Sequence, residues 1–149
     1  MNNHVLERLL NNAEQAKREA LQMVAENQRN TSHIEQQLQR LQQYRSEYAT
    51  QLQLQLGRGM STTLVSTYRQ FLHGLDNAIG QAQGLLTQQQ QKTDVSQQHW
   101  QQQQQRWQAF STLQQRQRDT QQQLQQRREQ RQTDELAQQF HAHRSKLID

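Results

Sequence analysis

The chain has 149 residues, of which only 31% are hydrophobic, and its formal net charge is +4. Globular domains draw on roughly 45–50% apolar residues including glycine, so this composition is too poor for a sizeable globular core. The chain has no cysteine, which excludes disulfides and thiolate chemistry, and it contains no apolar run of the roughly 18 residues that indicate a membrane span.

The distribution of helix breakers predicts two long helices. The chain has no proline, and its five glycines all fall between residues 57 and 84. In a helix interior, proline costs about 3 kcal/mol and glycine about 1 kcal/mol relative to alanine, so long stretches without either residue favour unbroken helix. The one tight glycine cluster, at Gly57 and Gly59, precedes Ser61 and predicts the only sharp turn. We therefore expect an all-α fold, a long antiparallel two-helix coiled-coil hairpin.

We expect residues 1–149 to form a single coiled-coil domain. The first helix is predicted at 1–56, the turn at 57–61, and the second helix at 62–145, with a C-terminal overhang beyond the start of the first helix. Glutamine-rich runs in the second helix can also indicate disorder. Helix is the favoured interpretation, because glutamine is a good helix former and the intervening apolar residues keep a helical period.

The first predicted helix carries a regular apolar seam. One row repeats every seven residues: Leu6, Ala13, Ala20, Asn27, Ile34, Leu41 and Tyr48. A companion row consists of Leu9, Ala16, Met23, Leu38 and Leu52. Spacings of three and four residues keep both rows facing a partner helix. Asn27, Asn30 and Thr31 interrupt the seam, either as a weak stretch or as polar residues that set the register of the two helices.

The second predicted helix opens with a denser stripe, and Ser61 or Thr62 is a good N-cap for it. The stripe consists of Leu64, Tyr68, Phe71, Leu72, Leu75, Ala78, Ile79, Ala82, Leu85 and Leu86. Three glycines inside it, at 74, 80 and 84, imply a close approach of the helices or a bend. The seam then thins to Trp100, Trp107, Phe110, Leu113, Leu124, Leu136, Phe140 and Leu147.

A turn centred near Arg58 fixes the expected register. Tyr48 then pairs with Arg69, and the aromatic part of the first helix lies level with the stripe that begins at Phe71. Met1 pairs near residue 116, so the second helix overhangs beyond that point. Six arginines and two carboxylates lie between 106 and 131, so this stretch carries the whole excess charge of +4. It is either a solvated face or a contact for an acidic partner or phosphate.

The sequence contains no motif of site chemistry. Nucleotide-binding, zinc-protease and nucleophile-elbow patterns are absent. His141 and His143 are two residues apart and point away from each other on a helix, so we expect no metal and no cofactor. A two-helix hairpin also offers no water-excluding pocket for catalysis. We expect a protein that is not an enzyme.

Two segments resemble the FliJ family of flagellar export proteins. Residues 38–48, LQRLQQYRSEY, resemble the family's L–L–YR-x-EY signature, and residues 68–79, YRQFLHGLDNAI, continue the match beyond the turn. The region around Trp107 and the run at 130–135 match more loosely. The similarity covers essentially the full length.

The resemblance implies a stalk and adaptor in the flagellar type III secretion system. FliJ-like proteins are antiparallel coiled coils that insert into a hexameric export ATPase, contact the cytoplasmic domain of the export gate, and in some cases bind export chaperones. It implies a role in motility and a cytoplasmic protein, recruited peripherally to the inner face of the cell membrane without inserting into it.

The resemblance also implies two sets of contact residues. The gate-facing surface matches Gln37, Leu41, Tyr44, Tyr48, Phe71, Leu75 and Ala78. Leu41 and Tyr48 lie on the seam row, so Tyr44 and Phe71 are the better candidates for exposure. The overhang and its charge predict the contact with the ATPase ring at Arg116, Arg118, Arg127, Arg128 and Arg131.

Two alternatives remain open. One is the equivalent stalk of a virulence injectisome, which gene neighbourhood would distinguish. The other is a coiled coil that binds nucleic acid through the arginine-rich stretch and stacks tryptophans on bases. That alternative predicts strongly salt-dependent binding to DNA or RNA, whereas the stalk binds no nucleic acid.

Overall fold

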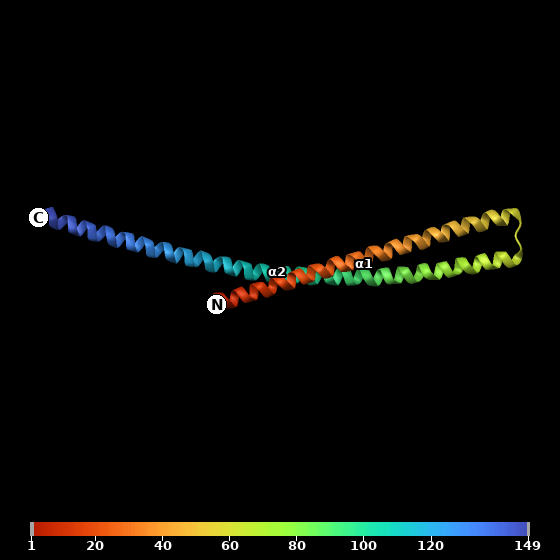
Figure 1. The fold of residues 1–149 in the computed structure, drawn as a ribbon, viewed down its shortest axis with the longest axis horizontal. Helices are drawn as coiled ribbons and strands as arrows, with labels where there is room; N and C mark the ends of the chain where they lie inside the picture. The colour runs from red at the N-terminus through yellow and green to blue at the C-terminus, as the bar shows by residue number, and fades with distance from the viewer. Residues whose placement is uncertain (1, 149) are drawn as a thin grey trace. The chain divides into compact units, whose positions relative to one another are not determined.

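The computed structural model describes residues 2–148 as two helices joined by a short turn (Figure 1). Helix α1 spans Asn3–Arg58 and helix α2 spans Thr62–Ile148, and residues 2–148 contain no strand. The all-α class and the two packed helices are confirmed. The first helix continues two residues beyond the expected boundary at 56 to Arg58, and the second continues beyond 145 to Ile148.

The turn is built from a glycine and a serine cap. Gly59 has a φ of 86°, in the left-handed region that glycine adopts without steric cost. Its N–H donates to the carbonyl of Leu56 at 3.3 Å and so ends α1. The Oγ of Ser61 accepts a hydrogen bond from the N–H of Leu64 at 3.3 Å. Ser61, rather than Thr62, is therefore the N-cap of α2.

By packing, the chain divides into two units. One unit is Gln15–Gln103, which includes the turn, and the other combines Met1–Glu14 with Gln104–Asp149. The single coiled-coil domain over residues 1–149 stays a prediction.

The seam of the unit Gln15–Gln103 follows the predicted seven-residue row on α1, but four apolar residues predicted for the seam are exposed: Met23, Leu64, Phe71 and Leu85. Ala20 is buried, and the later members of the row on α1 are half-buried. Met23, which we placed in the companion row, is 52% exposed, whereas its neighbour Val24 is 7% exposed. The change from three-residue to four-residue spacing thus occurs earlier than expected, because 3.6 residues per turn does not divide the seven-residue repeat.

The register agrees approximately with the one that a turn near Arg58 predicts. Tyr48 lies against Phe71, two residues beyond the expected Arg69, with ring centroids 4.6 Å apart. Arg45 pairs with Asp76 at 2.9 Å. The expected juxtaposition of the two aromatic stretches is confirmed, since Tyr48 and Phe71 meet edge to face.

A hydrogen-bonded polar layer interrupts the seam. The buried Gln89 donates through Nε2 to the Oδ1 of Asn27 at 3.2 Å and to its carbonyl at 3.3 Å. The hydroxyls of Thr31 and Thr93 lie 3.1 Å apart across the two helices. A slip of register would leave the buried Gln89 and the half-buried Asn27, Thr31 and Thr93 without these partners, which is costly. The structure therefore favours the register-setting interpretation over a weak stretch, although Asn30 is exposed and outside the layer.

The three glycines within α2 are not points of close helix approach. A methyl group built at Gly74, Gly80 or Gly84 meets no neighbouring atom within 4 Å. We expect alanine at all three positions to raise the free energy of unfolding by about 1 kcal/mol per site, because alanine reduces the entropy of the unfolded chain and is the better helix former.

Urea denaturation, monitored by circular dichroism, measures the free energy of unfolding of the triple alanine variant. Gly59→Ala is the matched control and should destabilise, because its φ of 86° is strained for any residue with a Cβ. Unchanged or lower stability of the triple alanine variant would show that these glycines serve a packing role.

In the unit that combines Met1–Glu14 with Gln104–Asp149, α2 extends beyond its partner. Leu6 and Ala13 are buried, and Asn3 lines a shallow cleft with the Arg116–Gln121 stretch of α2. Every residue from 118 to 148 is exposed. The expected pairing of Met1 with residue 116 lies outside the described residues.

The prediction that the last apolar residues of the second helix belong to the seam is therefore wrong. Four apolar side chains that we placed in the seam are exposed: Leu124, Leu136, Phe140 and Leu147. Their positions are helical, but within this unit α1 begins at Asn3, opposite Arg116–Gln121, and no part of it lies alongside them. Neither described helix contains a stretch long and apolar enough to cross a bilayer.

Candidate partner-binding surfaces

The seven residues expected to face a partner all lie in the unit Gln15–Gln103. Gln37, Leu41, Tyr44 and Tyr48 come from α1, and Phe71, Leu75 and Ala78 come from α2. Three of them are exposed: Gln37, Tyr44 at 52% and Phe71 at 46%. The other four are half-buried and contribute to the contact between the helices. Tyr44 and Phe71 thus have the exposure that a contact surface requires.

The aromatic patch is defined here as Tyr44, Tyr48 and Phe71. Two of its rings, those of Tyr48 and Phe71, are in contact. The edge of one ring meets the face of the other between Tyr48 and Phe71 at an interplanar angle of 62°. The same two side chains line a shallow cleft of about 210 Å³ with Thr67 and Tyr68. A fixed aromatic platform beside a cleft suits the anchor residue of another protein, because such anchors carry much of the energy of an interface.

An ion pair joins the helices beside this patch. The Nε of Arg45 donates to the Oδ1 of Asp76 at 2.9 Å, and both side chains are roughly half exposed. The hydrogen bond from Arg45 lowers the pKa of Asp76 below its ordinary value, and the same bond raises the pKa of Arg45. The pair adds a geometric constraint on register more than stability, since exposed ion pairs are screened by water.

The lowered pKa of Asp76 gives a pH dependence of defined sign. A carboxyl whose pKa is depressed in the folded state stabilises the fold above its unfolded pKa, and this stabilisation is lost as pH falls through the folded pKa. We expect the wild-type chain to lose stability in the acid range below about pH 4, and Asp76→Asn to reduce that loss slightly. Thermal unfolding across this pH range checks the result, with Asp94→Asn as the matched control. Identical acid profiles for wild type and Asp76→Asn would contradict it.

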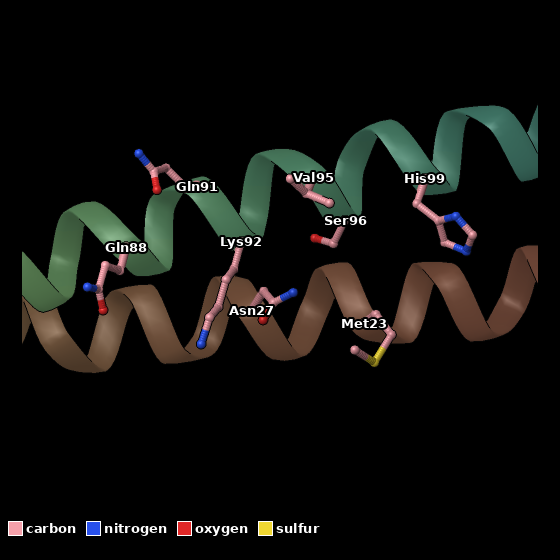
Figure 2. A pocket seen from close by; sticks show the side chains of 8 residues that line it. All are labelled: Met23, Asn27, Gln88, Gln91, Lys92, Val95, Ser96 and His99. Atoms are coloured by element: carbon pink, nitrogen blue, oxygen red, sulfur yellow. The ribbon is translucent and has the colours of Figure 1, made fainter.

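A second surface feature of this unit was not anticipated from the sequence. An open groove of about 620 Å³ runs between the helices and is lined by Met23, Asn27, Gln88, Gln91, Lys92, Val95, Ser96 and His99. Figure 2 shows Lys92 extending from α2 toward α1, with Met23 and Val95 on opposite helices. The sequence feature that could have indicated this groove is Val95, the only hydrophobic residue between Leu86 and Trp100.

The candidate ring-contact residues lie on α2 in the other unit. Arg116, Arg118, Arg127, Arg128 and Arg131 are all exposed. Asp119 accepts a hydrogen bond from Gln115 at 3.1 Å, and Asp134 accepts one from Gln130 at 3.3 Å. Neutral amides on the same helix thus engage these two carboxylates. The arginines present donors suited to bidentate pairing with carboxylate or phosphate.

The tryptophans and histidines give little support to nucleic-acid binding or to metal binding. Trp100 and Trp107 are half-buried, which disfavours base stacking by exposed indoles. His141 and His143 are exposed. Residues 2–148 contain no cluster of three or more side chains suited to holding a metal ion.

Comparison with known proteins gives consistent matches along the chain. Residues 2–146 match the family described as "Flagellar FliJ protein". The chain is 35% identical over 133 residues to the Flagellar FliJ protein of Salmonella typhi, an alignment that covers 89% of this chain and 90% of the relative. It is 33% identical over 126 residues to the Flagellar FliJ protein of Escherichia coli (strain K12), covering 85% and 86%.

Proposed function

The chain belongs to the flagellar FliJ family, and on this premise we propose that it is a non-enzymatic stalk and adaptor of the flagellar type III protein export apparatus. It links the hexameric export ATPase to the export gate and assists the delivery of substrates by export chaperones. The observation that carries this proposal is the family match over residues 2–146, which includes both helices and the turn.

The aromatic patch is the proposed contact with the cytoplasmic domain of the export gate. Two observations support it: Tyr44 and Phe71 are exposed, and Tyr48 fixes the ring of Phe71. Isolated exposed aromatics are common on protein surfaces, but aromatics gathered beside a cleft are typical of interface anchors. Gln37, Leu41, Leu75 and Ala78 complete the surface on the two helices.

The arginines of the overhang are the proposed contact with the ATPase ring. Their exposure and the lack of a neighbouring α1 segment within their unit leave this part of α2 accessible to a partner. Permanent charges favour oriented contacts that form and release, whereas a large apolar interface would hold the stalk in one position.

This function places the protein at the cytoplasmic face of the cell membrane, held there through the export apparatus. Both curated relatives are named as flagellar proteins, which supports the flagellar machine over an injectisome. The half-buried tryptophans make the nucleic-acid alternative the weaker one.

Deletion of the gene tests the proposal. We expect the deletion strain to lose swimming and to stop releasing extracellular flagellar subunits into the medium, with recovery of both on expression of the intact chain. A strain with normal flagella and impaired injectisome secretion would assign the protein to the other machine. Normal secretion by both machines would contradict any export role.

A further inference from the structure

The two flanks of the seam on α2 differ in polarity within the unit Gln15–Gln103. The seven-residue row from Ala20 to Tyr48 stays buried or half-buried along α1, so rows of the same spacing beside the seam each keep to one flank. On α2, the row on one flank consists of Leu64, Phe71, Ala78, Leu85, Lys92 and His99. The row on the other flank has no apolar residue and consists of Thr62, Arg69, Asp76, Gln83, Gln90 and Gln97.

Two clefts between the helices show which row lies on which flank. The groove of about 620 Å³ is lined by Met23 from α1 and Lys92 from α2, among others. A separate cleft of about 180 Å³ is lined by Glu35 from α1 and Gln90 from α2, among others. None of the described residues lines both. The apolar row of α2 therefore lies on the flank of the groove, and the polar row lies on the other flank.

The aromatic patch lies on the same flank as the groove. Tyr44 follows Met23 on α1 by three seven-residue repeats, and Phe71 precedes Lys92 on α2 by three repeats. Residues separated by whole repeats keep to one flank of a coiled coil. One partner can therefore cover the exposed rings of the patch and the groove without crossing the seam.

Apolar side chains connect the patch to the groove. Leu85 is 56% exposed, Met23 52% and Val95 65%. At a rise of about 1.5 Å per residue, α2 advances about 36 Å from Phe71 to Val95. The name flank strip is used here for Met23, Tyr44, Phe71, Leu85 and Val95. The strip is long and narrow, and its two helices border the groove at one end (Figure 2).

We propose that an amphipathic helix of the protein that binds the aromatic patch lies along the flank strip and fills the groove. The inference rests on the proposed function, which makes the cytoplasmic domain of the export gate the source of this helix. Amphipathic helices bind grooves through apolar anchors three, four and seven residues apart. A helix of about 24 residues matches the length of the strip, and at Met23 and Val95 it completes a local bundle of three helices.

Lys92 sets the charge expected of the occupant. Figure 2 shows Lys92 extending from α2 toward α1, and none of the eight residues that line the groove is a carboxylate. An acidic side chain on the bound helix, level with Lys92, complements this charge. A second copy of the chain is a poorer occupant, because a symmetric contact of groove with groove brings two lysines together and no carboxylate from the lining.

The absence of cysteine allows the occupant to be identified on the full-length chain. Val95→Cys carries a benzophenone maleimide in the groove. Leu21→Cys carries the same photocrosslinker on the opposite flank, because Leu21 is 50% exposed and lies one repeat before Gln28 of the smaller cleft. With the purified cytoplasmic domain of the export gate, we expect a crosslinked product from position 95 and none from position 21. Mass spectrometry of the product should locate the crosslink in a helical segment of the gate domain.

Unlabelled variants measure the contribution of the groove to gate affinity in calorimetric titration. Met23→Gln combined with Val95→Gln should weaken binding to the gate domain about tenfold or more, because both apolar side chains lose their transfer from water. Leu21→Gln combined with Leu56→Gln is the matched control, because both leucines lie in the row of the opposite flank and are similarly exposed. The control should bind as wild type, and circular dichroism should show equal helicity for all.

Charge reversal tests the acidic side chain expected on the occupant. Lys92→Glu should weaken gate binding, and added salt should narrow the difference from wild type, because salt screens exposed charge pairs. Arg69→Glu makes the same change of charge on the opposite flank of α2 and should bind as wild type. Equal losses in the two variants would indicate diffuse charge attraction and would contradict a specific contact at Lys92.

The experiments separate failure of this inference from failure of the gate contact itself. If Tyr44→Ala with Phe71→Ala weakens gate binding and Met23→Gln with Val95→Gln does not, the patch is the whole contact and the groove inference is wrong. If neither pair changes the affinity, the proposed gate contact is also wrong. A crosslink from position 95 to a second copy, or to a strand or loop of the gate domain, would overturn the assignment of a gate helix to the groove.

Discussion

Truncation of the chain after residue 114 is expected to abolish its stimulation of ATP hydrolysis by the export ATPase. The truncation removes all five candidate ring-contact arginines and the whole exposed stretch of α2. The purified ATPase, assayed by phosphate release with and without the chain, gives the measurement. The truncated protein should still bind the export gate, since the aromatic patch lies in the unit Gln15–Gln103.

A shorter truncation separates contact from folding. Ending the chain after residue 122 keeps the part of α2 beside Asn3 and removes Arg127, Arg128 and Arg131. We expect stimulation to fall strongly while the mean residue helicity remains. If either truncated protein stimulates ATP hydrolysis as well as the intact chain, the overhang is not the ring-contacting end.

Charge reversal tests the arginines without shortening the helix. Glutamate at Arg127, Arg128 and Arg131 should reduce stimulation partially, and added salt should narrow the difference from wild type, because exposed charge contacts are screened. Reversal of the exposed Arg29, Arg40 and Arg69 changes the net charge equally in the other unit and should leave stimulation unchanged. Equal losses in both triple variants would indicate an effect of net charge alone.

The second large effect is expected at the aromatic patch. Tyr44→Ala combined with Phe71→Ala should weaken binding to the purified cytoplasmic domain of the export gate by about 2 kcal/mol or more, which is about thirtyfold in Kd. Both side chains are close to half exposed, so helix content should persist despite the lost contact between Phe71 and Tyr48. Calorimetric titration gives the affinity and circular dichroism gives the helicity.

Phe140→Ala is the matched control, because Phe140 is an even more exposed aromatic in the other unit. Its gate affinity should equal that of the wild type. An unaltered affinity of the double variant with normal helicity would remove the patch from the interface. A loss of helicity would show instead that these rings belong to the core.

The sequence predicted the helices and the seam because both depend on local spacing. The seven-residue row through Ala20 and Leu41 faces the partner helix as expected. Val24 replaces Met23 in the seam, because the position of a three-to-four spacing change depends on the partner helix and is not set by one helix alone. Hydrophobicity could not decide it, since both residues are apolar.

The register and the polar layer depend on contacts between distant residues. Tyr48 pairs with Phe71, two residues beyond the Arg69 that the position of the turn predicted. The sequence suggested Asn27 as a register-setting residue but gave no means of identifying Gln89 among many similar glutamines. A hydrogen-bond partner 62 residues away in the sequence can be identified only from the packed helices.

The exposure of the candidate surface residues was predictable from the sequence only in part. Exposure of Tyr44 and Phe71 agrees with the expectation that they are not purely seam residues. Leu136 and Phe140 were expected to pack and are exposed, because apolar spacing marks a face without stating whether a partner covers it. The groove at Met23 and Val95 was not predicted from the sequence for the same reason.

We propose that this chain links the export ATPase to the export gate through two separate surfaces. Retention of the purified ATPase on immobilised gate domain, with and without the chain, tests that claim most directly. We predict that the intact chain increases retention, and that neither the truncation after residue 122 nor the Tyr44→Ala, Phe71→Ala variant does so. Retention that is the same without the chain, or equally increased by both variants, would contradict the link.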